Sequence, residues 1–150
     1  MGHVQKSNEE IADLFKKNGI KNTRQRQRVF DFLLSCNQPV TADVIYDELK
    51  KDLLTFETVN LSTVYRVLEI FIKNRLVTKT SFGNDHKAVF EIYRMEHRHH
   101  LICVKCNEIT PIKGCPLKGY EQSLSQSTHF KILEHRLEIL GVCPKCQVKM

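Results

Sequence analysis

The sequence predicts an α+β protein built from two small domains, residues 1–93 and residues 94–150. Apolar residues recur at helical spacing before Arg75, two strand-like segments follow it, and histidine and cysteine become frequent from Glu96 onward. The 150 residues are 41% hydrophobic and 27% charged, as in a globular protein. No apolar segment is long enough to span a membrane, and residues 1–10 lack the apolar core of a secretory signal, so we expect a cytoplasmic protein.

Capping residues and apolar stripes predict four helices in the first domain. The expected helix starts are Ser7 (with Glu10 as its capping-box partner), Thr23, Thr41, and Asn60 or Ser62. The expected core-facing residues are Ile11, Leu14, Phe15, Val29, Phe32, Leu33, Val44, Ile45, Leu49, Val64, Leu68, Phe71 and Ile72.

After the fourth helix the apolar pattern changes to that of strands. Residues 77–82 and 87–93 read as two strands, and Gly83-Asn84-Asp85 between them reads as a turn. Helices followed by such a hairpin predict a winged helix-turn-helix, with the fourth helix in the position of a recognition helix.

The second domain is predicted as strand, helix and strand. Residues 101–104 and 130–140 are strand-like, and residues 116–127 can form a weak helix. This pattern, bracketed by cysteine pairs, predicts a small α/β domain.

The two cysteine pairs are the most specific motifs in the chain. Cys103-Val104-Lys105-Cys106 and Cys143-Pro144-Lys145-Cys146 are both CxxC sequences. Two residues between cysteines let both sulfurs face one ion, and two such pairs complete a tetrahedron. Four thiolates leave no open coordination position, which predicts a structural zinc site whose metal contributes to folding. A redox dithiol is the alternative for a single CxxC pair.

Three histidines, His97, His99 and His100, precede the first cysteine pair. On a strand, His97 and His99 share one face and His100 takes the other. This clustering predicts a second metal site; a solvated polar strand end is the alternative. Further candidate ligands are Glu91, Cys115 and His135. Cys115 is either a soft ligand or a buried thiol.

The sequence lacks the motifs of several common enzyme classes. The sequence contains no HExxH, no GxSxG, no glycine-rich phosphate loop and no His-x-Glu of the zinc deaminases.

The chain is basic, with a net charge of +6. One segment without acidic residues contains Lys21, Arg24, Arg26 and Arg28. Such a run suits phosphate binding, although a solvated helix face has the same composition.

Four segments resemble the ferric uptake regulator family. Residues 18–28 and 61–68 resemble its DNA-binding half, residues 97–106 its histidine-rich strand and first cysteine pair, and residues 135–146 its closing strand and second pair. The likeness runs in order from about residue 8 to residue 147. It implies a homodimeric, metal-sensing transcriptional repressor without catalytic activity, with a winged-helix domain and a zinc-containing dimerisation domain.

The resemblance also assigns DNA contacts. Tyr65 and Arg66 would meet thymine methyl groups and phosphates in the major groove, and Lys21 would reach into an A·T-rich minor groove. Contacts to the DNA backbone are implied for Arg24, Arg28, Ser62 and Thr63. The implied partner is double-stranded DNA with an A·T-rich inverted repeat.

The family's interdomain sensing site is largely missing from this sequence. Of its five positions, only Glu91 and His100 carry the usual residue type. The other three positions read Pro39, Arg98 and Pro111. The peroxide-sensing variant needs histidine and aspartate at the altered positions and is therefore disfavoured.

The family's second site is better preserved. It keeps His97, His99 and His135, but Lys118 occupies the position of an expected acid. The nearby residues that could substitute are Cys115 and Glu121. We therefore expect the regulatory site around the three histidines, with Glu91 and His100 facing the hinge.

Taken together, the sequence predicts a repressor in which an effector metal fixes the spacing of the two winged helices. Zinc is favoured because the surviving ligands are histidines with a thiol nearby, and Fe²⁺ is the alternative. The rival functions are a zinc-ribbon protein-interaction module and a thiol redox switch, neither of which binds DNA sequence-specifically.

Overall fold

The computed structural model describes residues 6–51, 59–82, 87–94 and 98–149, which fall into two compact units, Met1–Tyr93 and Arg94–Met150. Each unit is described by itself. Within the described residues, no helix combines the length and apolar character that a membrane span requires.

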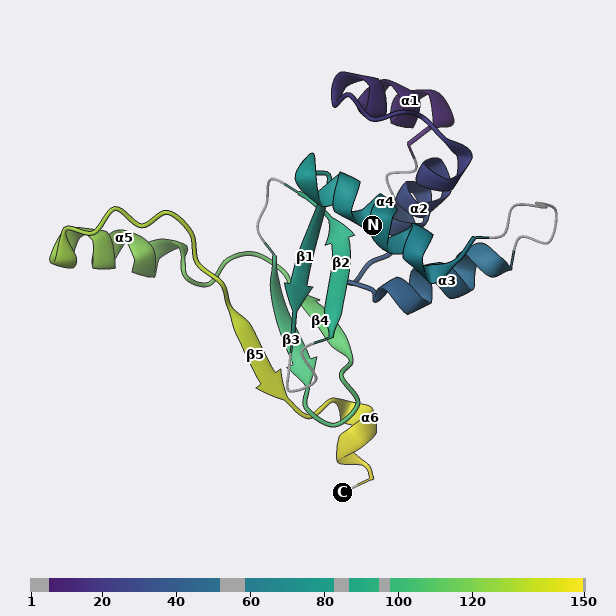
Figure 1. Cartoon of the computed structure of the whole chain (residues 1–150). Helices are drawn as coiled ribbons and strands as arrows, with labels where there is room; N and C mark the ends of the chain where they lie inside the picture. The colour runs from purple at the N-terminus through teal and green to yellow at the C-terminus, as the bar shows by residue number, and fades with distance from the viewer. Residues whose placement is uncertain (1–5, 52–58, 83–86, 95–97, 150) are drawn as a thin grey trace. The chain divides into compact units, whose positions relative to one another are not determined.

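The described part of the first unit contains four helices and a two-stranded sheet (Figure 1). The elements are α1 (Asn8–Lys17), α2 (Arg24–Ser35), α3 (Ala42–Lys50), α4 (Leu61–Lys73), β1 (Val77–Ser81) and β2 (Ala88–Ile92). All four helices begin at predicted caps, namely Ser7, Thr23, Thr41 and Asn60, and each cap side chain accepts a backbone N–H. The strands β1 and β2 pair antiparallel, with Thr78 opposite Glu91. The predicted turn at residues 83–85 lies outside the described residues.

Three phenylalanines form the centre of this unit. Phe15, Phe30 and Phe71 come from α1, α2 and α4, and their ring centroids lie 5.4 to 5.5 Å apart. Val44 was expected in the core but is exposed, because α3 packs through Ala42, Ile45 and Leu49. Leu14, Phe32 and Ile72 are only half-buried at the edge of this core, whereas Phe30 and Val67 are buried.

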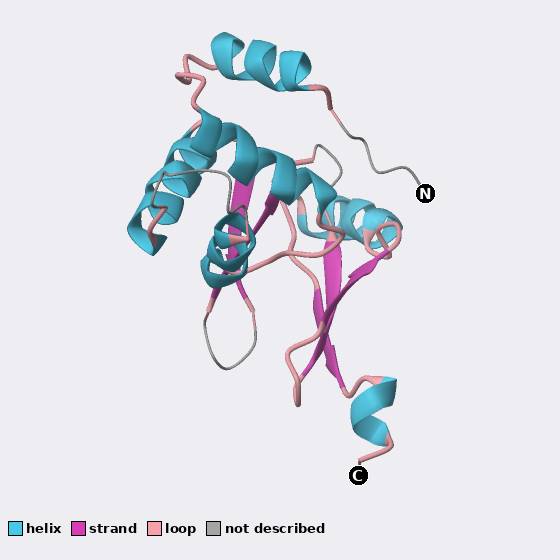
Figure 2. Ribbon diagram, turned by 90° about the vertical axis from the view of Figure 1, so that its right-hand side faces the viewer, coloured by secondary structure: helices cyan, strands magenta, loops and turns pink. Residues whose placement is uncertain are grey.

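Over residues 98–149, the second unit forms a three-stranded sheet and two helices. The elements are β3 (His99–Cys103), β4 (Ile109–Ile112), α5 (Lys118–Thr128), β5 (Glu138–Gly141) and α6 (Pro144–Gln147). The strand order is β4-β3-β5, with β3 antiparallel to β4 and parallel to β5. Figure 2 shows these strands and the short helix α6 that follows β5.

The sequence prediction for this unit was partly wrong. The predicted strand over residues 130–140 is reduced to Glu138–Gly141, where it pairs with β3. The strand β4 and the helix α6 were not predicted. The predicted helix is confirmed as α5, but it buries none of its residues within the described chain.

Candidate metal centres and nucleic-acid interface

The four predicted cysteines converge in the second unit. Cys103 ends β3, Cys106 follows in the next turn, Cys143 caps α6, and Cys146 lies within α6. Their sulfurs all lie within 4.8 Å of one another, and those of Cys106 and Cys143 are 3.7 Å apart. Sulfurs bound to one tetrahedral zinc at about 2.3 Å are separated by about 3.8 Å. This four-cysteine cluster therefore has the spacing of a closed metal site.

Backbone N–H groups and neighbouring thiols set the protonation of this cluster. The backbone N–H of Cys143 donates to the Cys103 sulfur over 3.3 Å. This hydrogen bond and a second one from the backbone N–H of Cys106 lower the pKa of Cys103 to about 6. Hydrogen bonds with Cys143 and Cys106 raise the pKa of Cys146 to about 12. One thiolate is thus stable at neutral pH, while full deprotonation requires a cation between the sulfurs.

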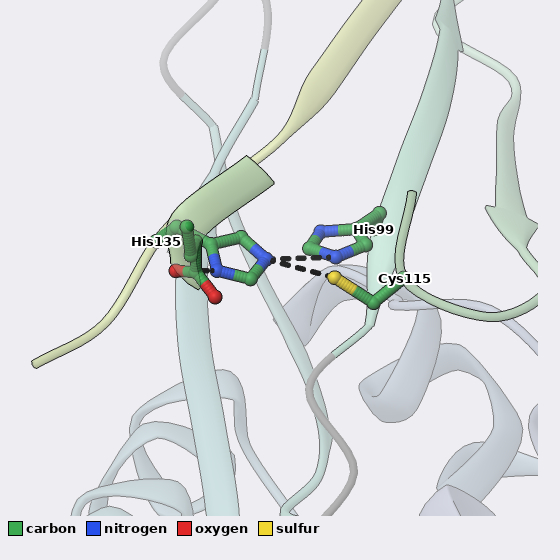
Figure 3. Close-up of polar contacts among 4 residues, drawn as sticks. His99, Cys115 and His135 are labelled. Carbon is green, nitrogen blue, oxygen red and sulfur yellow. Dashed lines mark hydrogen bonds and ion pairs between the residues drawn. The ribbon is translucent and has the colours of Figure 1, made fainter. Parts of the chain in front are cut away.

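A second cluster lies at the other end of β3 (Figure 3). It consists of His99 at the start of β3, Cys115 after β4 and His135 before β5, and we call it the histidine–cysteine cluster. The two Nε2 atoms of His99 and His135 are 3.1 Å apart, and the Cys115 sulfur is 3.3 Å from His135 Nε2. Ligands of one tetrahedral zinc would be separated by about 3.4 Å for two nitrogens and about 3.6 Å for nitrogen and sulfur.

Glu121 fixes the orientation of one of these ligands. Its carboxylate, on α5, bonds to Nδ1 of His135. An ionised carboxylate only accepts hydrogen bonds, so Nδ1 carries the proton and the lone pair of a neutral ring lies on Nε2, which faces His99 and Cys115. This carboxylate–histidine arrangement is typical of metal sites.

The histidine–cysteine cluster agrees only in part with the predicted ligand set. His99 and His135 are brought together, but His135 lies before β5 rather than in a strand. Cys115 joins them as a third donor, and Glu121 contacts His135. His97 lies outside the described residues. Residue spacing alone did not indicate that Glu121 would orient a histidine.

The other two predicted ligands lie elsewhere. His100 is buried on β3 opposite Pro111, and its pKa is lowered, chiefly by burial and then by Arg98 and His99. Glu91 is half-buried on β2 in the first unit, opposite Thr78.

The predicted DNA-contacting residues lie around α2 and α4. Ser62, Tyr65 and Arg66 are exposed on α4, at the spacing of one helix face, and Lys21 and Arg24 are exposed at the start of α2. The Thr63 hydroxyl donates to the Asn60 side chain over 2.9 Å.

Arg28 has a contact that the sequence did not predict. It is half-buried, and its guanidinium donates to the Leu49 carbonyl over 2.8 Å. This bond ties α2 to the last turn of α3.

A helical unit with a β-hairpin, followed by a unit with two clusters of metal-ligand type, defines a metal-binding regulator of the winged-helix class. A sequence model of the ferric uptake regulator family matches residues 17–140. The ferric uptake regulation protein of Legionella pneumophila is 36% identical over 139 residues, covering 92% of this chain and 99% of the relative. A peroxide-responsive repressor of Staphylococcus aureus strain Mu50 is 34% identical over 141 residues, covering 94% and 91%. The chain belongs to the ferric uptake regulator family.

Solved structures agree with this assignment. The ferric uptake regulator of Vibrio cholerae matches with a TM-score of 0.74 and 28% identity over 89% of this chain and 99% of that one. That of Helicobacter pylori, described as having three functional metal-binding sites, shares the fold with a TM-score of 0.78 at 23% identity, over 93% and 90% of the two chains. Proteins of the family are metal-responsive transcriptional repressors of metal homeostasis; they bind DNA, are dimeric and are not enzymes. The present chain is such a repressor.

Proposed function

We propose that this repressor is a cytoplasmic homodimer switched on by zinc at the histidine–cysteine cluster, with a second, structural zinc in the four-cysteine cluster. The observation that carries the proposal is the convergence of two imidazole nitrogens and one sulfur within 4.8 Å. Two imidazoles and a thiolate favour zinc over iron(II), which prefers harder oxygen ligands alongside nitrogen.

The positions of these three ligands support a regulatory role. His99 begins β3, shortly after the segment that joins the two units, while Cys115 and His135 come from the connections on either side of α5. A bound divalent ion would join the start of β3 to these two connections. His99 would then restrict the joining segment, so that fewer positions of the winged helices are sampled and those that match operator spacing are favoured.

DNA recognition is assigned to the exposed face of α4 and the segment before α2. Tyr65 and Arg66 would read the major groove, and Lys21 would enter an A·T-rich minor groove of an inverted repeat. Contacts to phosphates are proposed for Arg24, Ser62 and Thr63, while Arg28 would contribute less because it also holds the Leu49 carbonyl.

The dimer is proposed to form through the second unit, because much of its apolar surface is exposed. No described residue of α5 is fully buried, and β5 is one of the two edge strands of its sheet. The exposed apolar side chains of this unit are Leu101, Val104, Tyr120, Phe130, Leu133, Ile139, Leu140 and Val148. A second copy, as in the dimeric family members, would cover this surface.

A titration of DNA binding against each metal tests the effector assignment. The probe is a duplex selected by the zinc-loaded protein from a random pool, and the protein is first treated with a chelator too weak to empty the four-cysteine cluster. We expect zinc to restore binding at lower free concentration than iron(II) or manganese(II). His99→Ala should abolish the response, whereas His129→Asn, at an exposed histidine with φ 58°, should not. Restoration by iron at lower concentration than zinc would contradict the proposal.

Substitutions test the DNA assignment separately. Arg66→Ala and Lys21→Ala should each weaken operator binding by roughly 1–3 kcal/mol if the lost contact specifies a base. Lys50→Ala is the matched control, because Lys50 is exposed on α3 and pairs with Asp47. Unchanged operator affinity in both variants would contradict the assignment of α4 as recognition helix.

A further inference from the structure

A cleft of ≈ 370 Å³ opens between the start of α2 and one face of α4. Its α4 side consists of Thr63, Arg66, Val67 and Ile70, which follow the i, i+3, i+4, i+7 spacing of a single helix face. Its α2 side consists of Thr23, Arg24, Gln25 and Arg26. Among the described residues, three arginines and no acid line this cleft, and neither helix has an acidic residue in its first turn.

Local hydrogen bonding leaves donors available at the α2 side. The Thr23 oxygen accepts the N–H of Arg26, so the hydroxyl proton of Thr23 remains to be donated. The first N–H groups of a helix have no intrahelical acceptor, and after the cap has served Arg26 those of Arg24 and Gln25 remain. The positive end of the α2 dipole adds to the charge of the guanidinium groups.

Arg26 connects this cleft to the segment that carries Lys21. One nitrogen of its guanidinium donates to the Lys21 carbonyl over 2.7 Å, and the side chain is half-buried where it lines the cleft. A guanidinium has five N–H donors in a fixed plane, so this bond leaves others for a second acceptor. Arg26 can thus hold the Lys21 segment and an anion at the same time.

We infer that the cleft seats one backbone phosphate of the operator DNA, with Arg24 and Arg26 as its binding residues and Arg66 at its border. The inference rests on the proposed DNA-binding function and adds Arg26 to the interface. Phosphate is the expected ligand because its oxygens accept bidentate bonds from guanidinium groups and backbone N–H groups. A phosphate fixed here would set the register at which Tyr65 and Lys21 meet their grooves.

The first test compares charge-removing variants of the full-length, zinc-loaded dimer. Arg24→Gln and Arg26→Gln should each weaken binding roughly tenfold or more for the selected duplex and for a random duplex alike, and should lower the salt slope by about 1. Arg75→Gln is the matched control, since it removes the same charge at an exposed position of the same unit outside the cleft. Losses no larger than that of Arg75→Gln would contradict the inference.

The second test separates a phosphate contact from mere support of Lys21. Each phosphate of one half-site is replaced in turn by a neutral methylphosphonate. At one position, the methylphosphonate should lower the DNA affinity of the parent protein about as much as Arg26→Gln lowers it for the unmodified duplex. Combining Arg26→Gln with that methylphosphonate should lower the affinity no further than either change alone. If the fold-losses in affinity from Arg26→Gln and from the methylphosphonate multiply at every position, Arg26 acts only through Lys21, and the inference is overturned. A parent protein that selects no duplex would instead contradict the proposed function.

Discussion

At the scale of single residues, His135 is held in the orientation that the proposed metal site requires. Its Nδ1 is held by Glu121 and its Nε2 faces His99 and Cys115. A ring held in this way loses little rotational freedom when it ligates, and the carboxylate makes it a stronger base. The family position expected to carry an acid is Lys118 here. In the proposed site, Cys115 would therefore supply a thiolate in place of a carboxylate.

Replacement of Cys115 tests that difference. Cys115→Ser should weaken zinc binding at the histidine–cysteine cluster and remove the thiolate-to-cobalt absorption of the Co²⁺-substituted site, because a serine hydroxyl is a poor ligand at neutral pH. Cys36→Ser is the matched control. The half-buried Cys36 lies in the first unit, outside both clusters, and its sulfur donates to the Phe32 carbonyl over 3.2 Å. Equal spectra for the two variants would exclude Cys115 as a ligand.

Replacement of Glu121 tests the support of His135. Glu121→Ala should lower zinc affinity at the same cluster by about 10- to 100-fold without emptying the four-cysteine cluster, as expected for the loss of an orienting carboxylate. Competition with a chromophoric chelator measures both sites. Glu134→Ala removes an exposed carboxylate that pairs with Arg136, and it should leave both affinities unchanged. An unchanged affinity in the Glu121 variant would show that the contact is incidental.

At the scale of elements, the sequence was most informative where structure is decided locally. The four helix starts of the first unit were predicted because each cap bonds to a backbone N–H three residues away. The strand β4 was missed because it is defined by pairing with β3. Residues 130–136 were overpredicted as strand because, within the described residues, strand pairing with β3 begins only at Glu138. Of the two histidines in the histidine–cysteine cluster, His99 could be predicted from strand alternation and His135 from the family resemblance. Glu121 contacts His135 only because α5 places it there in the folded chain.

We expect the short helix α6 to depend on metal binding in the four-cysteine cluster. It has four residues, too few for a helix to persist by itself, and both cysteines of the second pair lie at or within it. Cys143→Ser should therefore release zinc, disorder this end of the chain and yield monomer or misfolded protein. Native mass spectrometry measures metal content and assembly together. A stable dimer with its full complement of zinc would contradict this prediction.

At the scale of the whole molecule, the two units differ in how they bury apolar surface. The first unit encloses Phe15, Phe30, Phe71 and Phe90 in one core, whereas the described part of the second unit has few buried residues and leaves the sides of β5 and α5 exposed. A unit of that size gains stability from metal ligation and from association, because its own core is small. Metal binding and dimerisation are therefore expected to be linked.

Charge placed on the exposed edge of β5 tests this linkage. Leu140 is 57% exposed, so Leu140→Glu costs little in a monomer but would bury an unpaired carboxylate in a dimer interface. We expect the variant to dissociate to monomer at concentrations where the parent protein is dimeric, and to bind the inverted repeat more weakly because two half-sites are no longer engaged together. Val44→Glu introduces the same charge at a residue 46% exposed on α3 of the first unit, and it should leave the dimer intact. Sedimentation equilibrium over a range of concentrations distinguishes the two, and a Leu140→Glu protein that associates as tightly as the parent would place the dimer interface away from β5.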